Sequence, residues 1–141
     1  MTKVPELAEG DRITRYINEK GKLRREGAAA GYNAFMPPRN LRLSVYHTET
    51  LDEPEVEQIA DDFVSTPDRP VLAKADLAVR IYSSAGLRIE IDGVPHPRHG
   101  NALGWSGQHA LQKVVALQLA EAATVSPISA DDRGGHAEAN A

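Results

Sequence analysis

Two histidines and an arginine lie close together in the segment VPHPRHGNALGW, residues 94–105. Imidazole can move protons near neutral pH, and a guanidinium group holds anions through its planar fork of donors. His99 is therefore a candidate proton shuttle, and Arg98 is a candidate ligand-binding residue. The segment could instead form a structural turn, in which the histidine satisfies neighbouring backbone groups and Trp105 closes the core over it.

A metal site built from the three histidines of this region is the weaker interpretation. His96, His99 and His109 have the spacing H-x2-H-x9-H, which matches no established zinc-binding pattern. His96 and His99 lie in a proline-constrained loop, and His109 falls near the polar side of an expected helix. We therefore expect no metal and no cofactor.

An anion site fits the same segment better. Ser106 is expected to cap a helix over residues 106–124, whose free N–H groups would attract an anion. Arg98 and His99 come shortly before this helix, and Arg15 would complete the site as a second anion holder. Glycines would let a ligand approach the backbone closely: Gly100, Gly104 and Gly107. With His99 transferring protons, such a site could act on a nucleotide or RNA.

Composition limits the classes of function. The chain has 141 residues, which is most simply one domain, and no cysteine, so disulfides and thiolate chemistry are excluded. The net charge of −4 is unlike that of a typical nucleic-acid-binding protein. The charge is uneven, because residues 1–40 carry +3 whereas residues 49–62 carry seven acidic and no basic side chains. That acidic segment could be a solvated helix face or a docking surface for a basic partner.

The expected location is the cytoplasm. The first residues contain no apolar run typical of a signal peptide. No stretch approaches the roughly 20 apolar residues that are needed to cross a membrane.

Alternating residues predict strands over 11–17 and 41–48. In the first strand, Arg15 shares a face with apolar neighbours, so it either lies at a half-covered end or holds an anion. In the second, Ser44 and His47 have opposite parity, which argues against a nucleophile–base pair. Ser44 and Tyr46 should share a face.

Helical periodicity is clearest over residues 51–65. Asp52 is a good N-cap with Glu55 three residues later, and Pro54 lies in the first turn. The expected apolar stripe follows the spacing i, i+3, i+4, i+7, i+8: Val56, Ile59, Ala60, Phe63 and Val64.

The remaining elements are less distinct. Residues 74–93 favour a β-hairpin, with a helix ending at Gly86 followed by one strand as the alternative. The expected helix over 106–124 has one apolar stripe: Leu111, Val114, Val115, Leu119 and Ala122. Residues 1–10 are expected to be a flexible lead-in, 11–124 a single domain and 125–141 a disordered tail.

The order TRYI, NAFMPP, LRLSVYHT and RHGNALGW resembles a group of small bacterial proteins that have no established activity. The matching positions are Arg15, residues 34–35, residues 43–45 and residues 99–104, and the sequence departs at Gly100, where the pattern has alanine. The resemblance implies that Arg15, Ser44 and His99 form one constellation, with Ser44 contacting a ligand. It also implies an association with mobile-element or defence genes.

We therefore expect an α+β fold with a small, mostly antiparallel sheet of about four or five strands and two helices packed on it. Two functions remain open. The first is a binding or accessory module that acts through protein partners. The second is a small enzyme or toxin-like protein that acts on a nucleotide or RNA, with Arg15 as the anion holder and His99 as the proton shuttle.

Overall fold

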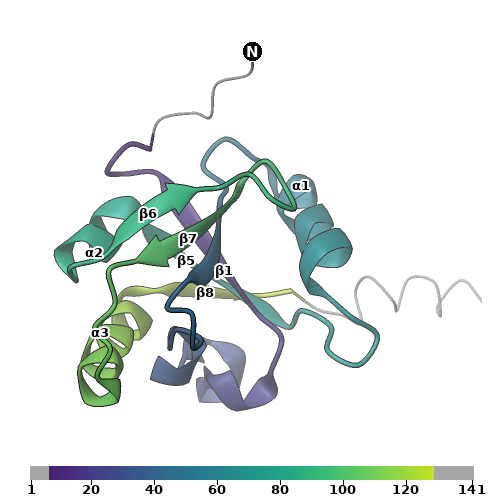
Figure 1. Ribbon diagram of the computed structural model, residues 1–141. Helices are drawn as coiled ribbons and strands as arrows, with labels where there is room; N and C mark the ends of the chain where they lie inside the picture. Colours follow the sequence, from purple (N-terminus) through teal and green to yellow (C-terminus); the bar gives the residue numbers. More distant parts are fainter. Residues whose placement is uncertain (1–6, 129–141) are drawn as a thin grey trace, which may run out of the picture.

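The computed structural model describes residues 7–128. Its main element is an antiparallel sheet of six strands in the order β6-β7-β4-β1-β5-β8 (Figure 1). The strands are β1 Arg12–Ile17, β4 Leu43–His47, β5 Ala73–Ala78, β6 Arg88–Ile91, β7 His99–Leu103 and β8 Thr124–Pro127. A separate two-stranded sheet pairs β2 (Leu23–Arg24) with β3 (Ala29–Ala30).

The described residues form three α-helices, which are α1 (Glu53–Ile59), α2 (Val79–Ser84) and α3 (His109–Ala122). Short 3-10 turns η1 (Lys20–Lys22), η2 (Arg25–Gly27) and η3 (Tyr32–Ala34) flank the small sheet, and a π-helical turn, η4 (Ala60–Val64), follows α1. The predicted α+β class with an antiparallel sheet is confirmed. The predicted counts are wrong, because the sheet has six strands and three α-helices accompany it.

Strand pairing determines which side chains share a face of the sheet. Ile13 pairs with His47 on one side and with Leu77 on the other, so these side chains point to the same face. We call this the core face, because α2, α3 and η3 contribute to the cluster that covers it. Fully buried members of this cluster are Ile13, Ile17, Phe35, Leu43, Val45, Tyr82 and Leu119.

The opposite face, which we call the α1 face, carries a smaller core. Tyr16 and Tyr46 pack there against Val56 and Ile59 of α1. The Tyr16 hydroxyl donates to the Val56 carbonyl at 2.7 Å, so the helix is bonded to the sheet as well as packed on it. The two faces therefore have different coverings, and α1 lies across the sheet from α3 (Figure 1).

The prediction for α1 is confirmed at its start and wrong at its end. Asp52 Oδ1 accepts from the Glu55 amide at 2.9 Å, as expected of an N-cap. The chain then widens into the π turn η4, which rotates the last turn relative to an α-helix. Phe63, expected in the core, is 41% exposed as a result.

The predicted hairpin over residues 74–93 is wrong, because α2 separates β5 from β6. Val79 and Tyr82 are both buried, three residues apart, which suits one helical turn against the sheet. The helix ends in a Schellman motif, with the Leu87 amide bonded to the Tyr82 carbonyl and the Gly86 amide to Ser83. Gly86 has φ 89°, so the helix-ending role considered for this glycine is correct.

Helix α3 begins later and faces the core differently than predicted. Its first residue is His109, and Ser106 lies before it, where its hydroxyl accepts from the Gln108 amide at 3.0 Å. The predicted stripe is correct for Leu119, which is fully buried, and for Val115, which packs against the core; it is wrong for Leu111 and Val114, which are 50% and 56% exposed. Apart from Leu119, the buried side chains are small or polar, which lets the helix lie close to its neighbours: Gln112, Ala116 and Ala120.

The predicted tail begins too early. Residues 124–127 form β8, which pairs with β5, and Ile128 is buried in the α1-face core. The remainder of that predicted tail and most of the predicted lead-in lie outside the described residues. Leu7, within the predicted lead-in, packs against the core.

Candidate functional site

Three side chains on the α1 face form a continuous hydrogen-bonded chain. His99 Nε2 lies 2.6 Å from Ser44 Oγ, and His99 Nδ1 lies 2.6 Å from Asp92 Oδ1. Ser44 is in β4, His99 is the first residue of β7, and Asp92 follows β6 directly. The register of β4 with β7 pairs Tyr46 with His99, which brings His99 next to Ser44 on the same face. We call these three residues the Ser–His–Asp chain.

Asp92 is the hub of the connection between β6 and β7. Its Oδ2 accepts from Asn101 Nδ2 at 3.0 Å, and its Oδ1 also accepts from the Val94 amide at 3.2 Å. Burial alone would raise the pKa of Asp92, but the hydrogen bonds from His99, Val94 and Asn101 outweigh it and lower the pKa. The carboxylate form is therefore favoured, and it requires a proton on His99 Nδ1. A neutral His99 then has an acceptor at Nε2 for the Ser44 hydroxyl.

Arg15 lies on the other face of the sheet. It shares the core face with Ile13, as predicted, but its Nε and Nη1 donate to the carbonyls of Ala34 and Ser44, both at 3.0 Å. Burial lowers the pKa of the guanidinium. The prediction that Arg15 and His99 form one site is therefore wrong, because the sheet separates the two side chains.

The predicted anion site at a helix N-terminus is not assembled either. His99 begins β7, whereas Ser106 comes after the far end of that strand. Arg98 donates its amide to His96 Nδ1 at 3.0 Å, and its carbonyl accepts from the His47 amide. Its Nη1 is buried without a hydrogen-bond partner. Within residues 7–128, no group of three or more His, Asp or Glu side chains is placed to hold a metal ion.

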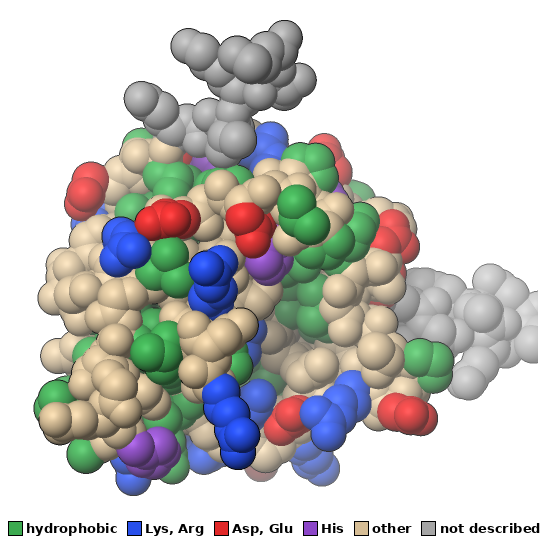
Figure 2. All heavy atoms as spheres, in the orientation of Figure 1, with side chains coloured by type: hydrophobic (Ala, Val, Ile, Leu, Met, Phe, Trp, Pro, Cys, Tyr) green, Lys and Arg blue, Asp and Glu red, His purple; other side chains and the backbone are tan. Residues whose placement is uncertain are grey.

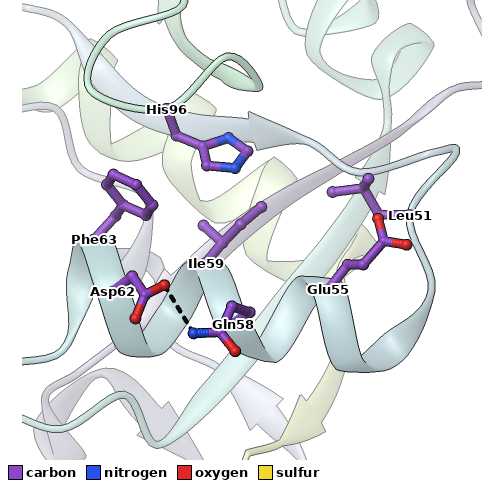
Figure 3. A pocket seen from close by; sticks show the side chains of 7 residues that line it. All are labelled: Leu51, Glu55, Gln58, Ile59, Asp62, Phe63 and His96. Atoms are coloured by element: carbon purple, nitrogen blue, oxygen red, sulfur yellow. Dashed lines mark hydrogen bonds between the residues drawn. The ribbon is translucent and has the colours of Figure 1, made fainter.

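A hollow of about 210 Å³ lies between α1, η4 and the loop that carries His96 (Figure 3). The His96 ring projects from the loop toward the helix and meets Phe63 edge-on at 5.0 Å between centroids. We call this the α1 hollow. Its lining residues are Leu51, Glu55, Gln58, Ile59, Asp62, Phe63 and His96.

Tyr46 connects the α1 hollow with the Ser–His–Asp chain. Its ring meets those of His99 and His96 edge-on, at 5.2 Å and 6.3 Å between centroids. In Figure 2, acidic side chains lie mostly in the upper half of the view, where Figure 1 places α1, and basic side chains mostly in the lower half. The lining of the hollow itself includes two acidic side chains, Glu55 and Asp62.

Comparison with known proteins adds no assignment: no family model, no curated protein and no solved structure matches the chain. None of the helices in residues 7–128 has the length and apolar character required to cross a membrane. The departure at Gly100 has a structural explanation, because a Cβ there would lie 2.6 Å from the Glu90 carbonyl oxygen. Glycine thus permits the close approach of β6 and β7.

Sequence reasoning identified Ser44 and His99 but missed Asp92. The available signal was the Asp-Gly dipeptide at 92–93, directly after an alternating apolar segment, which is typical of a turn between paired strands. A turn there would have folded β7 back beside β6 and brought Asp92 toward His99.

Acid titration should reveal the lowered pKa of Asp92. A folded-state pKa below the unfolded value of 3.8 means that the unfolded chain binds more protons in this range, so stability falls as the pH falls. We expect the stability advantage of the natural protein over Asp92→Asn to be full at about pH 5 and to shrink as the pH drops below about 4. Urea unfolding at several pH values measures this difference. The exposed Asp68→Asn serves as the control, and a gap independent of pH would contradict the assignment.

Proposed function

We propose that this chain is a protein-binding module whose α1 hollow receives one apolar side chain from a basic segment of a partner protein. The observation that carries the proposal is the exposed aromatic side chain of Phe63 at the edge of the hollow, 41% exposed. An exposed aromatic group against a concave, partly apolar surface is the arrangement that anchors partner side chains in protein interfaces.

The size of the hollow favours a single side chain over a small-molecule ligand. Its volume of about 210 Å³ is below the roughly 300–1,000 Å³ of typical ligand pockets. Ile59 lies between the ring of Phe63 on one side and Leu51 on the other, and the His96 imidazole lies across from Ile59 (Figure 3). These surroundings suit a branched aliphatic side chain.

Charge selects the chemistry of the partner. Glu55 and Asp62 line the hollow and are exposed, and they belong to the segment 49–62, which has seven acidic and no basic side chains. Part of that acidity has an internal role, because Asp52 caps the helix and Glu53 lies near Lys74. Glu55 and Asp62 remain at the rim, where they would attract lysine or arginine and speed encounter with a basic segment.

The test is an NMR titration with a lysine-rich peptide that carries one central leucine. We expect shifts concentrated in residues 51–63 and 94–97, and a weakening of binding by about tenfold in Phe63→Ser and in the double variant Glu55→Lys/Asp62→Lys. Leu117→Ser is the matched control for the first, because Leu117 is 47% exposed on α3, away from the hollow. Asp68→Lys is the control for the second.

Two comparison peptides separate the contributions. Replacing the lysines with glutamates should abolish the shifts, and replacing the leucine with glycine should remove those of Phe63 and Ile59. Shifts that gather on α3 instead of the hollow, or equal binding by the acidic peptide, would overturn the proposal.

A further inference from the structure

The Ser–His–Asp chain has the connectivity of a nucleophile, a base and an orienting carboxylate. Ser44 Oγ is 2.6 Å from His99 Nε2, and His99 Nδ1 is 2.6 Å from Asp92 Oδ1. These separations are within hydrogen-bond reach in both steps of the chain, as a general base and its orienting group require. The same contacts would also satisfy a histidine with a purely structural role, so the accessibility and surroundings of each group matter.

A reactive serine must be more accessible than the histidine that activates it, and this is the case here. Ser44 is half-buried, whereas His99 is 9% exposed and has both ring nitrogens occupied. The imidazole is thus fixed in orientation, and the serine bonded to it is not fully buried. Asn101 holds the second oxygen of Asp92, which prevents the carboxylate from rotating away from His99.

We propose that Ser44 is a nucleophile, activated by His99 and Asp92, that attacks small activated carboxylic esters. Ser44 Oγ would bond to the ester carbonyl carbon while its proton passes to His99 Nε2. The bond from that carbon to the leaving alcohol then breaks, and the alcohol takes the proton from His99. Water attacks the resulting acyl-serine in the same way, which releases the carboxylic acid and restores Ser44.

The position of Ser44 in the fold limits the substrates. The residue lies within strand β4 and not on a strand-to-helix turn, where backbone N–H groups would stabilise the oxyanion. Removing one such donor costs roughly 10²–10³ in rate in other enzymes. The substrate must therefore supply a good leaving group, as a phenyl ester does, and amides are not expected to react.

The chemistry of the neighbouring groups favours a neutral acyl group. Arg15 is on the opposite face and is bonded to two carbonyls, so it cannot hold a phosphate near Ser44. Two uncharged side chains also contact the Ser–His–Asp chain. The Tyr46 ring meets the His99 ring, and Asn101 donates a hydrogen bond to Asp92. This inference is independent of the proposed docking at the α1 hollow, and either can fail without the other.

A fluorophosphonate probe tests the nucleophile directly, because it forms a stable adduct with an activated serine. Mass spectrometry after digestion locates the adduct. We expect labelling of Ser44 at about 10²-fold the rate of the Ser44→Ala protein, whose residual labelling gives the background. The rate of p-nitrophenyl acetate hydrolysis should fall in Ser44→Ala together with the labelling rate.

Ser126→Ala is the matched control. Ser126 is also half-buried and lies on the same face, because it pairs with Lys74, which pairs with Tyr16 of that face. This variant should react like the natural protein. Asp92→Asn is expected to be less stable near neutral pH but still folded without urea, as shown by a cooperative urea transition, and to lose at least tenfold in labelling rate because the imidazole tautomer is no longer fixed.

The result that would overturn the inference is natural protein that labels no faster than Ser44→Ala, or an adduct found on another serine. Unchanged labelling in Asp92→Asn would overturn it as well. His99 would then be a structural histidine that joins β4 to the β6–β7 connection.

Discussion

Replacing Asp76 with alanine is expected to destabilise the protein by about 3–5 kcal/mol, because it leaves a buried ammonium group without its main partner. Lys74 is 5% exposed at its side chain, and its Nζ lies 2.6 Å from Asp76 Oδ2. Glu53, its other acidic neighbour, is 3.6 Å away and mostly exposed. A loss of this size is a large part of the roughly 5–15 kcal/mol that stabilises a typical domain.

The same aspartate supports a second buried group. Its Oδ1 accepts from Thr14 Oγ1 at 2.7 Å, and Thr14 in turn lies 2.6 Å from Thr48 Oγ1. Both threonines are fully buried. Asp76→Ala therefore also removes the acceptor that the buried Thr14 hydroxyl uses.

Urea unfolding of a double-mutant cycle measures the coupling. The double variant Lys74→Met/Asp76→Leu replaces both charges by apolar side chains, so it should recover much of the stability lost in Asp76→Ala. The cycle of Lys74→Met and Asp76→Ala should be strongly non-additive. A loss below about 1 kcal/mol in Asp76→Ala, with additive single changes, would mean that the ammonium is stabilised by water instead.

Arg15→Ala is the second large effect, and we expect a loss of about 2–4 kcal/mol of stability. The substitution removes the Nε and Nη1 donors of Arg15, so the carbonyls of Ala34 and Ser44 lose the hydrogen bonds that they accept from this side chain. The effect should be one of stability alone, because Arg15 faces away from both the α1 hollow and the Ser–His–Asp chain. Thermal and urea unfolding measure it, and fluorophosphonate labelling of the folded fraction should be unchanged.

Three further variants divide the role of Arg15. Arg15→Met keeps the apolar stem and loses only the donors, and Arg15→Lys keeps the charge but cannot reach both carbonyls with a planar fork. We expect stability in the order Arg, Lys, Met, Ala. Tyr82→Phe is the control for polar burial nearby, because the Tyr82 hydroxyl is buried with no hydrogen-bond partner and its removal should cost little. If Arg15→Met equals the natural protein, the two hydrogen bonds contribute nothing.

Local patterns identified the parts of the fold that depend on local geometry. The Asp52 cap and the shared face of Ser44 and Tyr46 follow from spacing within one element, and both are confirmed. The orientation of α3 depends instead on how closely a helix can approach its neighbours. Its alanines made that approach possible, so the larger Leu111 and Val114 were left outside.

The candidate site was identified only in part for the same reason. Ser44 and His99 were selected as residues, yet their contact requires the β4–β7 register, and Asp92 joins them only through the pairing of β6 with β7. Arg15 was placed on the correct side of its own strand. The error was to assume that His99 shared that side, which parity within a single strand cannot determine.

The strand order has a consequence for folding during synthesis on the ribosome. Strand β1 is the first of the six along the chain but occupies an interior place, with β4 on one side and β5 on the other. A nascent chain therefore exposes β1 with both edges unpaired until β4 and then β5 have emerged. The apolar Ile13 and Ile17 remain uncovered during that interval, so chaperone engagement should concentrate on the segment around β1. The six-stranded sheet is complete only once β8, the last of its strands in the described part of the chain, has been made.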